Sequence, residues 1–425
     1  MHFAWGGTPV LWRAAATLSL AALLGPVAAA DQKAPEAAAA AFDRVSKAAT
    51  EARTQNRLEA AIGLYRQAVG LRPSWADGWW FLGELLYDQN QYPEARDSLR
   101  RLIDLDHTTG PGFALLGLCE FETKEYARAL NHIYQARRLG LGDDPQVRRV
   151  VLFHEMLLLT RLQEYESAMQ VLMTVVEDGG AGPAVIEAAG LAGLRRPIFP
   201  EELQPSDKDL VESAGRAVCA MAERDRSAAE KYFAELLARY PKAPNVHYLY
   251  GLFLAATDKD GSLREYQKEL ELNPKHTEAL TNVALEYEVR GDLDTAIAYA
   301  RRAVEAGPQF FGAHAVLGKL LASDGEVEQG IKELEIARQQ AADSPKLTML
   351  NRLNSSARNC RFTDFRDGPT SQAVSLISAK SKLRRAGPRN VFRPSVPNTP
   401  LLGPVPPGAF TGIEKYEALA APRPK

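Results

Sequence analysis

The sequence predicts an all-α protein, an α-solenoid built from about eight helix hairpins. The first observation is a fixed spacing of 34 residues at which small and apolar residues return. The second is the pattern inside each copy, where apolar residues recur at i, i+3, i+4 and i+7 on either side of a short polar turn. The third is composition: 46% of the residues are hydrophobic and 24% are charged, which is ordinary globular usage. A repeat array can reach 425 residues without one ever-larger core.

The first 30 residues have the order of parts of a secretory signal peptide. Arg13 precedes an apolar stretch of 11 residues, Ala14 to Leu24, which is followed by Gly25-Pro26 and the small residues Ala28 to Ala30. This stretch is shorter than the roughly 20 apolar residues that span a bilayer. We therefore expect cleavage after Ala30 and a periplasmic or extracellular mature protein without a membrane span.

Four independent positions recur at the 34-residue spacing in the first three copies. They are Ala49, Gly83 and Gly117; Ala61, Ala95 and Ala129; Tyr65, Leu99 and Ile133; and Ala68, Leu102 and Ala136. Small residues at such positions are expected where two helices touch. The phase defines eight copies, over residues 42–75, 76–109, 110–143, 149–182, 210–243, 244–276, 277–310 and 311–344.

These residues resemble the tetratricopeptide-repeat family. The family's spaced positions are most complete in Trp79, Leu82-Gly83, Ala95 and Leu99, and its closing proline appears as Pro73, Pro241, Pro274 and Pro308. The resemblance covers about three quarters of the chain. It implies a right-handed superhelix in which the first helix of each hairpin lines a concave groove that binds a protein or peptide.

The period fails between residues 183 and 209. Ala184 to Leu194 is predicted to form one extra helix, and Arg195 to Ser206, with three prolines, is predicted to be a loop. We expect an N-terminal array over 31–182 and a C-terminal array over 210–349, joined by this hinge. A continuous superhelix through the extra helix stays open as the alternative.

The phase also names the side chains that are expected in the groove. The first copy places Asp43 and Thr50 there. The predicted partner-binding residues are Asp77, Trp80, Glu84, Tyr87, Asp88, Leu118, Phe121, Glu122 and Phe153. For Trp80, Tyr87 and Phe121 the alternative is burial against the neighbouring repeat. An aromatic and acidic surface of this kind suits a peptide with apolar anchors and some positive charge.

The best-known subclass of the family grips the C-terminal carboxylate of chaperones with basic and amide side chains in this groove. The matching places carry Thr50, Glu84 and other non-basic residues. The resemblance therefore does not imply a chaperone-tail receptor.

No catalytic, metal-binding or cofactor-binding constellation is recognisable in the sequence. The seven histidines never pair at metal-ligand spacing, and Cys119, Cys219 and Cys360 are too few and too scattered for a zinc site. The glycine run 179–182 lacks the lysine of a phosphate-binding loop. A net charge of −2 gives no general attraction to nucleic acid. We expect a protein that is not an enzyme, needs no cofactor and binds no nucleic acid.

The tail over 350–425 is predicted to be disordered, basic and rich in proline. Residues 351–425 hold 13 Lys and Arg against four Asp and Glu, so the rest of the chain carries −11. Such a tail is suited to an anionic envelope polymer or a neighbouring protein, or to folding back on the acidic groove. A change of reading frame near Leu347 is a third explanation for the abrupt change in composition.

The sequence thus favours an exported, non-catalytic scaffold that holds a protein or peptide in its concave groove. The alternative is a structural or assembly subunit of a cell-envelope complex, which binds through its convex face and its tail.

Overall fold

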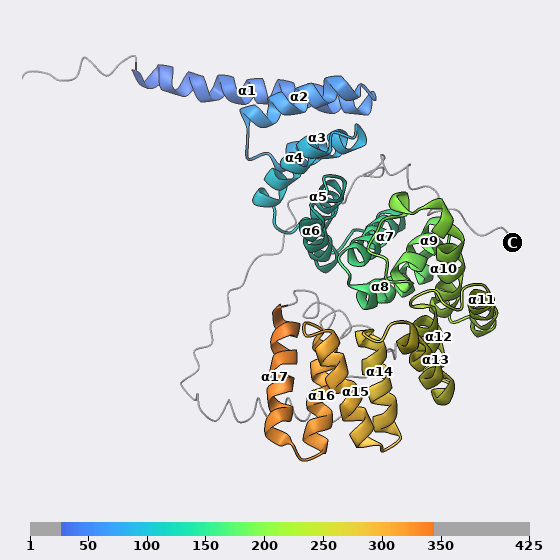
Figure 1. The fold of residues 1–425 in the computed structure, drawn as a ribbon. Helices are drawn as coiled ribbons and strands as arrows, with labels where there is room; N and C mark the ends of the chain where they lie inside the picture. Colours follow the sequence, from blue (N-terminus) through green and yellow to red (C-terminus); the bar gives the residue numbers. More distant parts are fainter. Residues whose placement is uncertain (1–26, 344–425) are drawn as a thin grey trace, which may run out of the picture.

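The computed structural model describes residues 27–343, and these form seventeen α-helices and two short 3-10 helices. The predicted all-α solenoid is confirmed (Figure 1). The predicted tail lies outside the described residues. So does most of the predicted signal peptide, although the first described helix begins at Val27, before the expected cleavage point. Within 27–343, no helix is both long enough and apolar enough to cross a membrane.

The first four hairpins pair consecutive helices along the chain. They are α1 (Val27–Thr54) with α2 (Leu58–Leu71), α3 (Ala76–Asp88) with α4 (Tyr92–Leu105), α5 (Gly110–Glu122) with α6 (Tyr126–Leu139), and α7 (Pro145–Arg161) with α8 (Tyr165–Gly179). Each pair falls within one of the copies phased from the sequence, apart from the ends of α1 and α7, which begin before the phased copies.

The connecting segment and the last four hairpins follow. The connector holds α9 (Pro183–Gly193), η1 (Pro200–Glu202) and η2 (Pro205–Asp207). The hairpins are α10 (Lys208–Ala222) with α11 (Arg226–Arg239), α12 (Val246–Leu254) with α13 (Lys259–Leu272), α14 (Thr277–Val289) with α15 (Leu293–Ala306), and α16 (Phe311–Ser323) with α17 (Val327–Asp343).

The turn inside most hairpins depends on one residue with left-handed backbone geometry. In the second hairpin this residue is Asn90, with φ of 57°. The Gln91 amide donates to the Leu86 carbonyl and the Asn90 amide to the Tyr87 carbonyl, which satisfies two end carbonyls of α3. The same place is held elsewhere by Asn56, Lys124, Gln163, Arg224, Gly291 and Gly325.

The small residues of the period lie where the two helices of a hairpin touch. A Cβ atom added to Gly83 would lie 2.7 Å from Cγ of Leu99. Ala95 and Leu99 are fully buried on the facing helix α4. The periodic glycine therefore allows α3 and α4 to pack closely, as the pattern predicts.

A recurring hydrogen bond joins one hairpin to the turn before it. Nε1 of Trp79 donates to the Pro73 carbonyl at 2.8 Å. Histidine holds the same repeat position twice: Nε2 of His247 lies 2.9 Å from the Pro241 carbonyl and Nε2 of His314 lies 3.0 Å from the Pro308 carbonyl. Because a carbonyl only accepts, each histidine carries a proton on Nε2.

The connector packs tightly on the fifth hairpin. A Cβ atom on Gly190 of α9 would lie 2.0 Å from the Val211 carbonyl oxygen, and one on Gly215 of α10 would lie 1.9 Å from that of Ile186. Backbones in such contact leave no room for side chains. One hydrophobic cluster runs through this region, from Ala49 to Leu249. The packing is therefore continuous across 183–209, and the division into two arrays stays a prediction.

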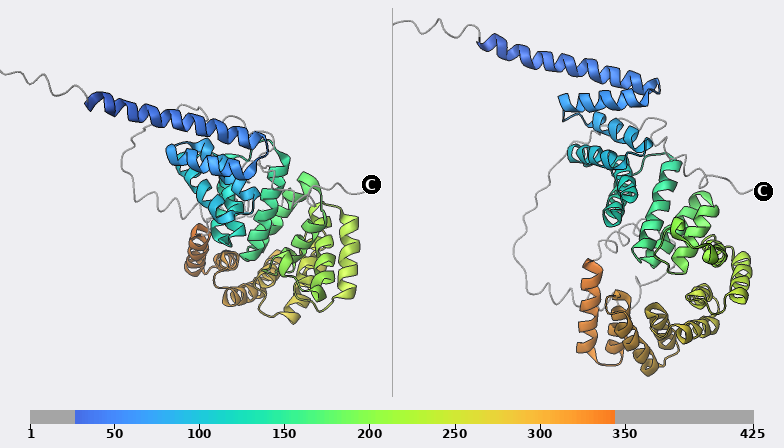
Figure 2. Two further views of the ribbon diagram at one scale, coloured as in Figure 1. Left: turned by 90° about the horizontal axis from the view of Figure 1, so that it is seen from above. Right: turned by 45° about the horizontal axis from the view of Figure 1, so that its top comes forward.

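The stack follows a curved path. Helices α1 and α2 lie at one end, the chain turns through α7 to α12, and α16 and α17 come back toward the side of α6 (Figure 1). The two other views show the same return (Figure 2). The curvature decides which hairpins can touch beyond their neighbours in sequence.

Candidate partner-binding surface

The predicted binding residues come from the first helices of three successive hairpins. Helix α3 carries five of them, α5 carries Leu118, Phe121 and Glu122, and α7 carries Phe153. Helix α3 contacts α5, and α5 contacts α7. The three helices that carry these residues thus stack one on the next.

Five of the nine are too buried to form an open surface. Trp80, Glu84, Tyr87, Leu118 and Phe153 each expose less than a tenth of their area. The four apolar or aromatic members of this group belong to the continuous hydrophobic cluster. The expectation of exposure in a groove is therefore corrected for Glu84, Leu118 and Phe153, and for Trp80 and Tyr87 the structure has the alternative, burial. The physical reason is that α3 contacts α2 and α5 as well as α4, so more than one face of the helix is covered. Their part in binding stays a prediction.

Phe121 packs on the connector. Its ring lies edge-on to the rings of Phe199, at 5.2 Å, and of His154, at 4.8 Å. Phe199 also contacts Tyr126, and the Arg161 guanidinium lies 5.2 Å from the Phe199 ring. Sequence reasoning missed Phe199, whose only signal is an isolated aromatic residue between two prolines of the loop.

The partly exposed members are Asp77, Asp88, Phe121 and Glu122. Three of them are carboxylates that recur at the repeat spacing. Asp43 and Asp77 are 34 residues apart on α1 and α3, and Asp88 and Glu122 are 34 apart on α3 and α5. We call these two pairs the carboxylate columns. Asp43 lies in the middle of the long helix α1, Asp77 lies in the first turn of α3, and Asp88 and Glu122 are the last residues of α3 and α5.

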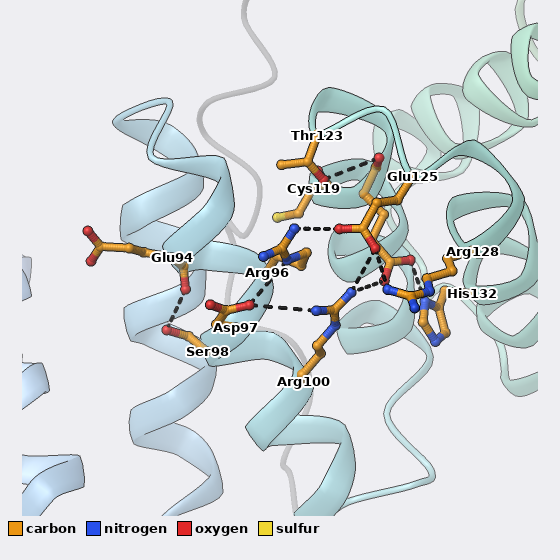
Figure 3. Close-up of polar contacts among 11 residues, drawn as sticks. Glu94, Arg96, Asp97, Ser98, Arg100, Cys119, Thr123, Glu125, Arg128 and His132 are labelled. Atoms are coloured by element: carbon orange, nitrogen blue, oxygen red, sulfur yellow. Dashed lines mark hydrogen bonds and ion pairs between the residues drawn. The ribbon is translucent and has the colours of Figure 1, made fainter.

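A network of charged side chains joins the second hairpin to the third (Figure 3). Glu120 of α5 is fully buried and accepts from Nη2 of Arg100 at 3.0 Å and pairs with Nδ1 of His132 at 2.6 Å. Glu125 is bound by Arg128 at 2.5 Å, by Arg100 at 3.1 Å and also by Arg96. These contacts join α4 to α5 and α6.

The charges in this network are matched. Burial alone would raise the pKa of Glu125, but the hydrogen bond from Arg128 and the charges of the other arginines outweigh it, so the pKa lies below its usual value. Burial alone would lower the pKa of Arg100, but the hydrogen bond to Glu120 and the charges of Glu120 and Glu125 outweigh burial and raise the pKa. A network whose members are paired in this way stabilises an interface between hairpins. Each of these two groups has a partner of opposite charge that keeps it ionised.

Two thiols and a further carboxylate, in the third, fourth and fifth hairpins, are buried. Cys119 and Cys219 have almost no exposed area, and burial raises the pKa of the Cys119 thiol. Glu155 accepts from Nη1 of Arg137 at 2.6 and 2.8 Å. Within residues 27–343 no cluster of three or more His, Cys, Asp or Glu side chains could hold a metal ion.

Comparison with known families supports the repeat phase. The sequence profile described as "Tetratricopeptide repeat" matches residues 46–108, 216–274, 252–309 and 284–345. Repeats of this family are typically non-catalytic and bind proteins or peptides.

One curated protein and several solved structures are similar to the chain. The probable biofilm formation methyltransferase WspC of Pseudomonas putida is 38% identical over 88 residues, which are 20% of each chain. The chain thus spans about a fifth of the length of this curated relative. Among structures, YrrB, titled a TPR protein with an unusual peptide-binding site, is 15% identical, covers 59% of this chain and 95% of its own, and has a TM-score of 0.25.

Two further structures have the same level of similarity. A tetratricopeptide-repeat protein of Parabacteroides merdae is 14% identical over 75% of this chain and 99% of its own, with a TM-score of 0.30. The yeast Sti1 TPR2AB domain in its pHSP90 complex is 14% identical over 75% of this chain and 97% of its own, with a TM-score of 0.26. TM-scores of this size do not establish a shared overall shape.

Proposed function

Because this chain belongs to the tetratricopeptide-repeat family, we propose that it is an exported scaffold, without catalysis of its own, that holds a partner protein or peptide on the first helices of its N-terminal hairpins. The observation that carries this proposal is the pair of carboxylate columns. Asp43 on α1 and Asp77 on α3 are one repeat apart, and so are Asp88 and Glu122, the last residues of α3 and α5. Charges at a fixed spacing favour a partner that runs along the stack and presents basic groups at intervals.

The partner's second property is an apolar anchor. Phe121 is only partly buried and lies next to Glu122 at the end of α5. Aromatic side chains supply a large contact area, and interfaces use them as anchors within a polar rim. A peptide that combines an apolar side chain with a nearby lysine or arginine fits this arrangement.

The test of binding uses charge reversal on the first helices, with a matched control on the second helices. Asp43→Lys with Asp77→Lys changes one carboxylate column. Glu59→Lys with Asp104→Lys makes the same charge change at exposed positions of α2 and α4, in the same two hairpins. Full-length chains are used to capture partners from a cell-envelope extract, and the affinity of the captured partner is then measured by calorimetry at two salt concentrations.

We expect the first-helix variant to lose the partner and the second-helix control to keep it. The affinity of the unchanged protein should fall as salt rises, because exposed charges are screened. If both variants keep the partner, the groove is not the binding surface. Loss with the control alone would instead favour the alternative, an assembly subunit that binds through its convex face.

Export is tested separately, by N-terminal sequencing of the protein recovered from the cell envelope. The expected first residue is Asp31. Recovery of the chain in the cytosol with its first 30 residues intact would contradict export and would leave the binding test unaffected.

A further inference from the structure

Arg195, the residue that follows Leu194 at the end of α9, touches three hairpins at once. Its Nη1 lies 2.7 Å from Oε1 of Glu166 at the start of α8, and its Nη2 pairs with Glu278 at the start of α14. The guanidinium also lies 4.6 Å from the ring of Tyr165 and 5.8 Å from the ring of Tyr248 on α12. One side chain thus connects the fourth, sixth and seventh hairpins.

A second set of hydrogen bonds runs beside this contact. Asn245, just before α12, donates from Nδ2 to the Leu194 carbonyl at 3.0 Å. Its Oδ1 accepts from Nε2 of His276 at 3.0 Å, and its backbone amide donates to Glu269 at 2.9 Å. Asn245 and Arg195 both have positive φ, of 69° and 56°. Two residues in a costly backbone conformation therefore meet at one junction.

The ion pairs lie largely out of solvent. The Arg195 side chain is 15% exposed and that of Glu278 is 16% exposed, whereas that of Glu166 is 50% exposed. Burial alone would lower the pKa of Arg195, but the charges of Glu166 and Glu278 outweigh it and raise the pKa. Burial alone would raise the pKa of Glu278, but the neighbouring His276 ring and the charge of Arg195 outweigh it. Both groups remain charged. Removing Arg195 leaves the largely buried Glu278 without the guanidinium, whereas removing Glu278 leaves Arg195 its pair with the half-exposed Glu166.

This contact is unusual for a solenoid. In a stack of hairpins each unit normally touches only its neighbours, so small rotations at successive interfaces add up and the stack can flex. Arg195 and Glu278 are 83 residues apart. A bond that skips whole hairpins removes that freedom, because it closes a loop through the intervening interfaces.

We propose that Arg195 holds the fourth, sixth and seventh hairpins in fixed positions relative to one another and so sets the curvature of the stack. The segment that carries Arg195, the connector, is itself fixed in place. The connector cannot slide, because Gly190 of α9 and Gly215 of α10 hold the two backbones in contact. Glu166 and Glu278 both lie in the first turn of a helix, where a carboxylate is favoured by the helix dipole. This inference does not depend on the identity of any partner or on export.

The test measures the distance between the two halves of the full-length chain. Spin labels are placed at Asp104→Cys on α4 and Glu305→Cys on α15, which are exposed positions. Cys360 is replaced by serine, and the buried Cys119 and Cys219 are kept. The chain without the two introduced cysteines should take up no label. Electron–electron double resonance then gives the distribution of distances between α4 and α15.

The matched control is Arg196→Ala. Arg196 is the next residue of the same loop, and its ion pair with Asp207 stays within the connector. We expect unchanged protein and the Arg196→Ala variant to give the same single narrow peak. Arg195→Ala should lose that peak and give a broad distribution while circular dichroism shows the same helix content. Arg195→Lys, which can reach one carboxylate only, should give an intermediate width.

A narrow, unshifted peak in a folded Arg195→Ala variant would overturn the proposal, even if the variant were less stable. If this variant does not fold, Glu278→Gln decides the question, because it keeps the shape of the side chain and leaves Arg195 its pair with Glu166. A broad distance distribution in this variant supports the proposal, and a narrow one overturns it. Glu166→Gln should broaden the distribution less than Glu278→Gln, since Glu166 is half exposed.

Discussion

Single residues decide how closely the helices of this stack approach. Gly190 and Gly215 face each other's helices at distances that no side chain could occupy, since an added Cβ would lie 2.0 Å or less from a carbonyl oxygen. Gly63, in the middle of α2, is also a helical glycine but has no atom within 4 Å of such a Cβ. The same residue type therefore has opposite consequences at the two places.

Gly215→Ala should lower the free energy of unfolding by about 1–3 kcal/mol, because the backbones of α9 and α10 must move apart. Gly63→Ala should raise it by roughly 0.5–1 kcal/mol, since alanine favours the helix and meets nothing. Denaturant unfolding of both variants checks the prediction. Equal effects of the two changes would contradict the packing described here.

The buried pair of His247 and Glu265 predicts a pH dependence of stability. Nδ1 of His247 lies 2.6 Å from the carboxylate, and the hydrogen bond to Glu265, with that to Pro241, raises the pKa of His247. Burial would raise the pKa of Glu265, but the bond from His247 outweighs it and lowers the pKa. The stabilisation from His247 is present below its unfolded pKa of about 6.5 and is lost as pH rises through its higher folded pKa. That from Glu265 is present above about 4.3 and is lost as pH falls.

His247→Gln should therefore cost most between about pH 4.5 and 6.5, and the cost should shrink toward alkaline pH. The measurement is the difference in free energy of unfolding between the variant and the unchanged protein across pH 4 to 9. His107→Gln, at an exposed loop position, serves as the control and should show no such trend. A pH-independent difference for His247→Gln would show that the ring is neutral throughout.

At the residue scale, the sequence predicts which helix carries a side chain better than it predicts exposure. The phase correctly directs the small residues Gly83 and Ala95 to the contact between α3 and α4. It left open whether Trp80 and Tyr87 are exposed or buried, because their exposure depends on how neighbouring hairpins rotate against each other. A 100° step between residues describes one helix and not the helices around it.

Helices differ in how they begin. In the C-terminal half, Asp225, Asp258 and Asp292 each accept a hydrogen bond from a backbone amide in the first turn of α11, α13 and α15. The second helices of the first four hairpins begin at residues that make no side-chain cap, among them Arg57 before α2. The second helices α2, α4, α6 and α8 thus lack one source of local stability that α11, α13 and α15 have.

Arg57→Asp should supply the missing cap and raise the free energy of unfolding by about 0.5–1 kcal/mol. Arg57→Ala removes the same charge without adding an acceptor and should change stability little. Thermal unfolding of the two variants separates capping from the loss of the arginine. A smaller increase in stability with aspartate than with alanine would contradict the explanation by capping.

At the scale of elements, the hairpins could be predicted because each is specified locally. The repeat spacing fixes the helix pairs, and the turn residues such as Asn90 and Gly291 end the first helix of each hairpin in the left-handed geometry. The loop after α9 could not be predicted in the same way. Its conformation depends on Phe199 packing against Phe121 and on Arg195 reaching α14, and both contacts join segments far apart in sequence.

Residues 27–343 contain one large hydrophobic cluster and two small ones. The large cluster runs from Ala49 to Leu249, and the small ones lie within residues 248–313 and 284–321. The last described hairpin also leaves Val327 and Ile331 exposed on α17. In a solenoid, a unit with a neighbour on one side only is held by fewer interfaces.

Amide hydrogens of α16 and α17 should therefore exchange faster than those of α7 to α10 in the native protein. Hydrogen exchange followed by mass spectrometry on the full-length chain checks this. The peptides of α1 and α2, at the other end of the stack, provide the comparison for end effects. Equal protection of α17 and α7 would mean that an additional contact covers the last hairpin.

The curvature of the stack is the property that sequence predicts least. Periodicity shows that hairpins stack, but the angle between successive hairpins is the sum of many side-chain contacts. Here one of those contacts, between Arg195 and Glu278, spans 83 residues and leaves no periodic trace in the sequence. The exposure of the candidate binding residues is hard to predict from sequence for the same reason, since it depends on the angles between hairpins.

The bond from a ring N–H to a proline carbonyl six residues earlier shows what this repeat preserves. Trp79 at this place and His247 and His314 at the equivalent places differ in size and aromatic surface, yet each presents a donor to the same acceptor. Histidine differs from the aromatic residue of the family pattern at this position. It nevertheless supplies the same hydrogen-bond donor to the proline carbonyl. The exchange also alters what the turn responds to. Tryptophan has one nitrogen and makes the turn indifferent to protons, whereas the second nitrogen of His247 contacts Glu265 on the following helix and thereby links its turn to pH.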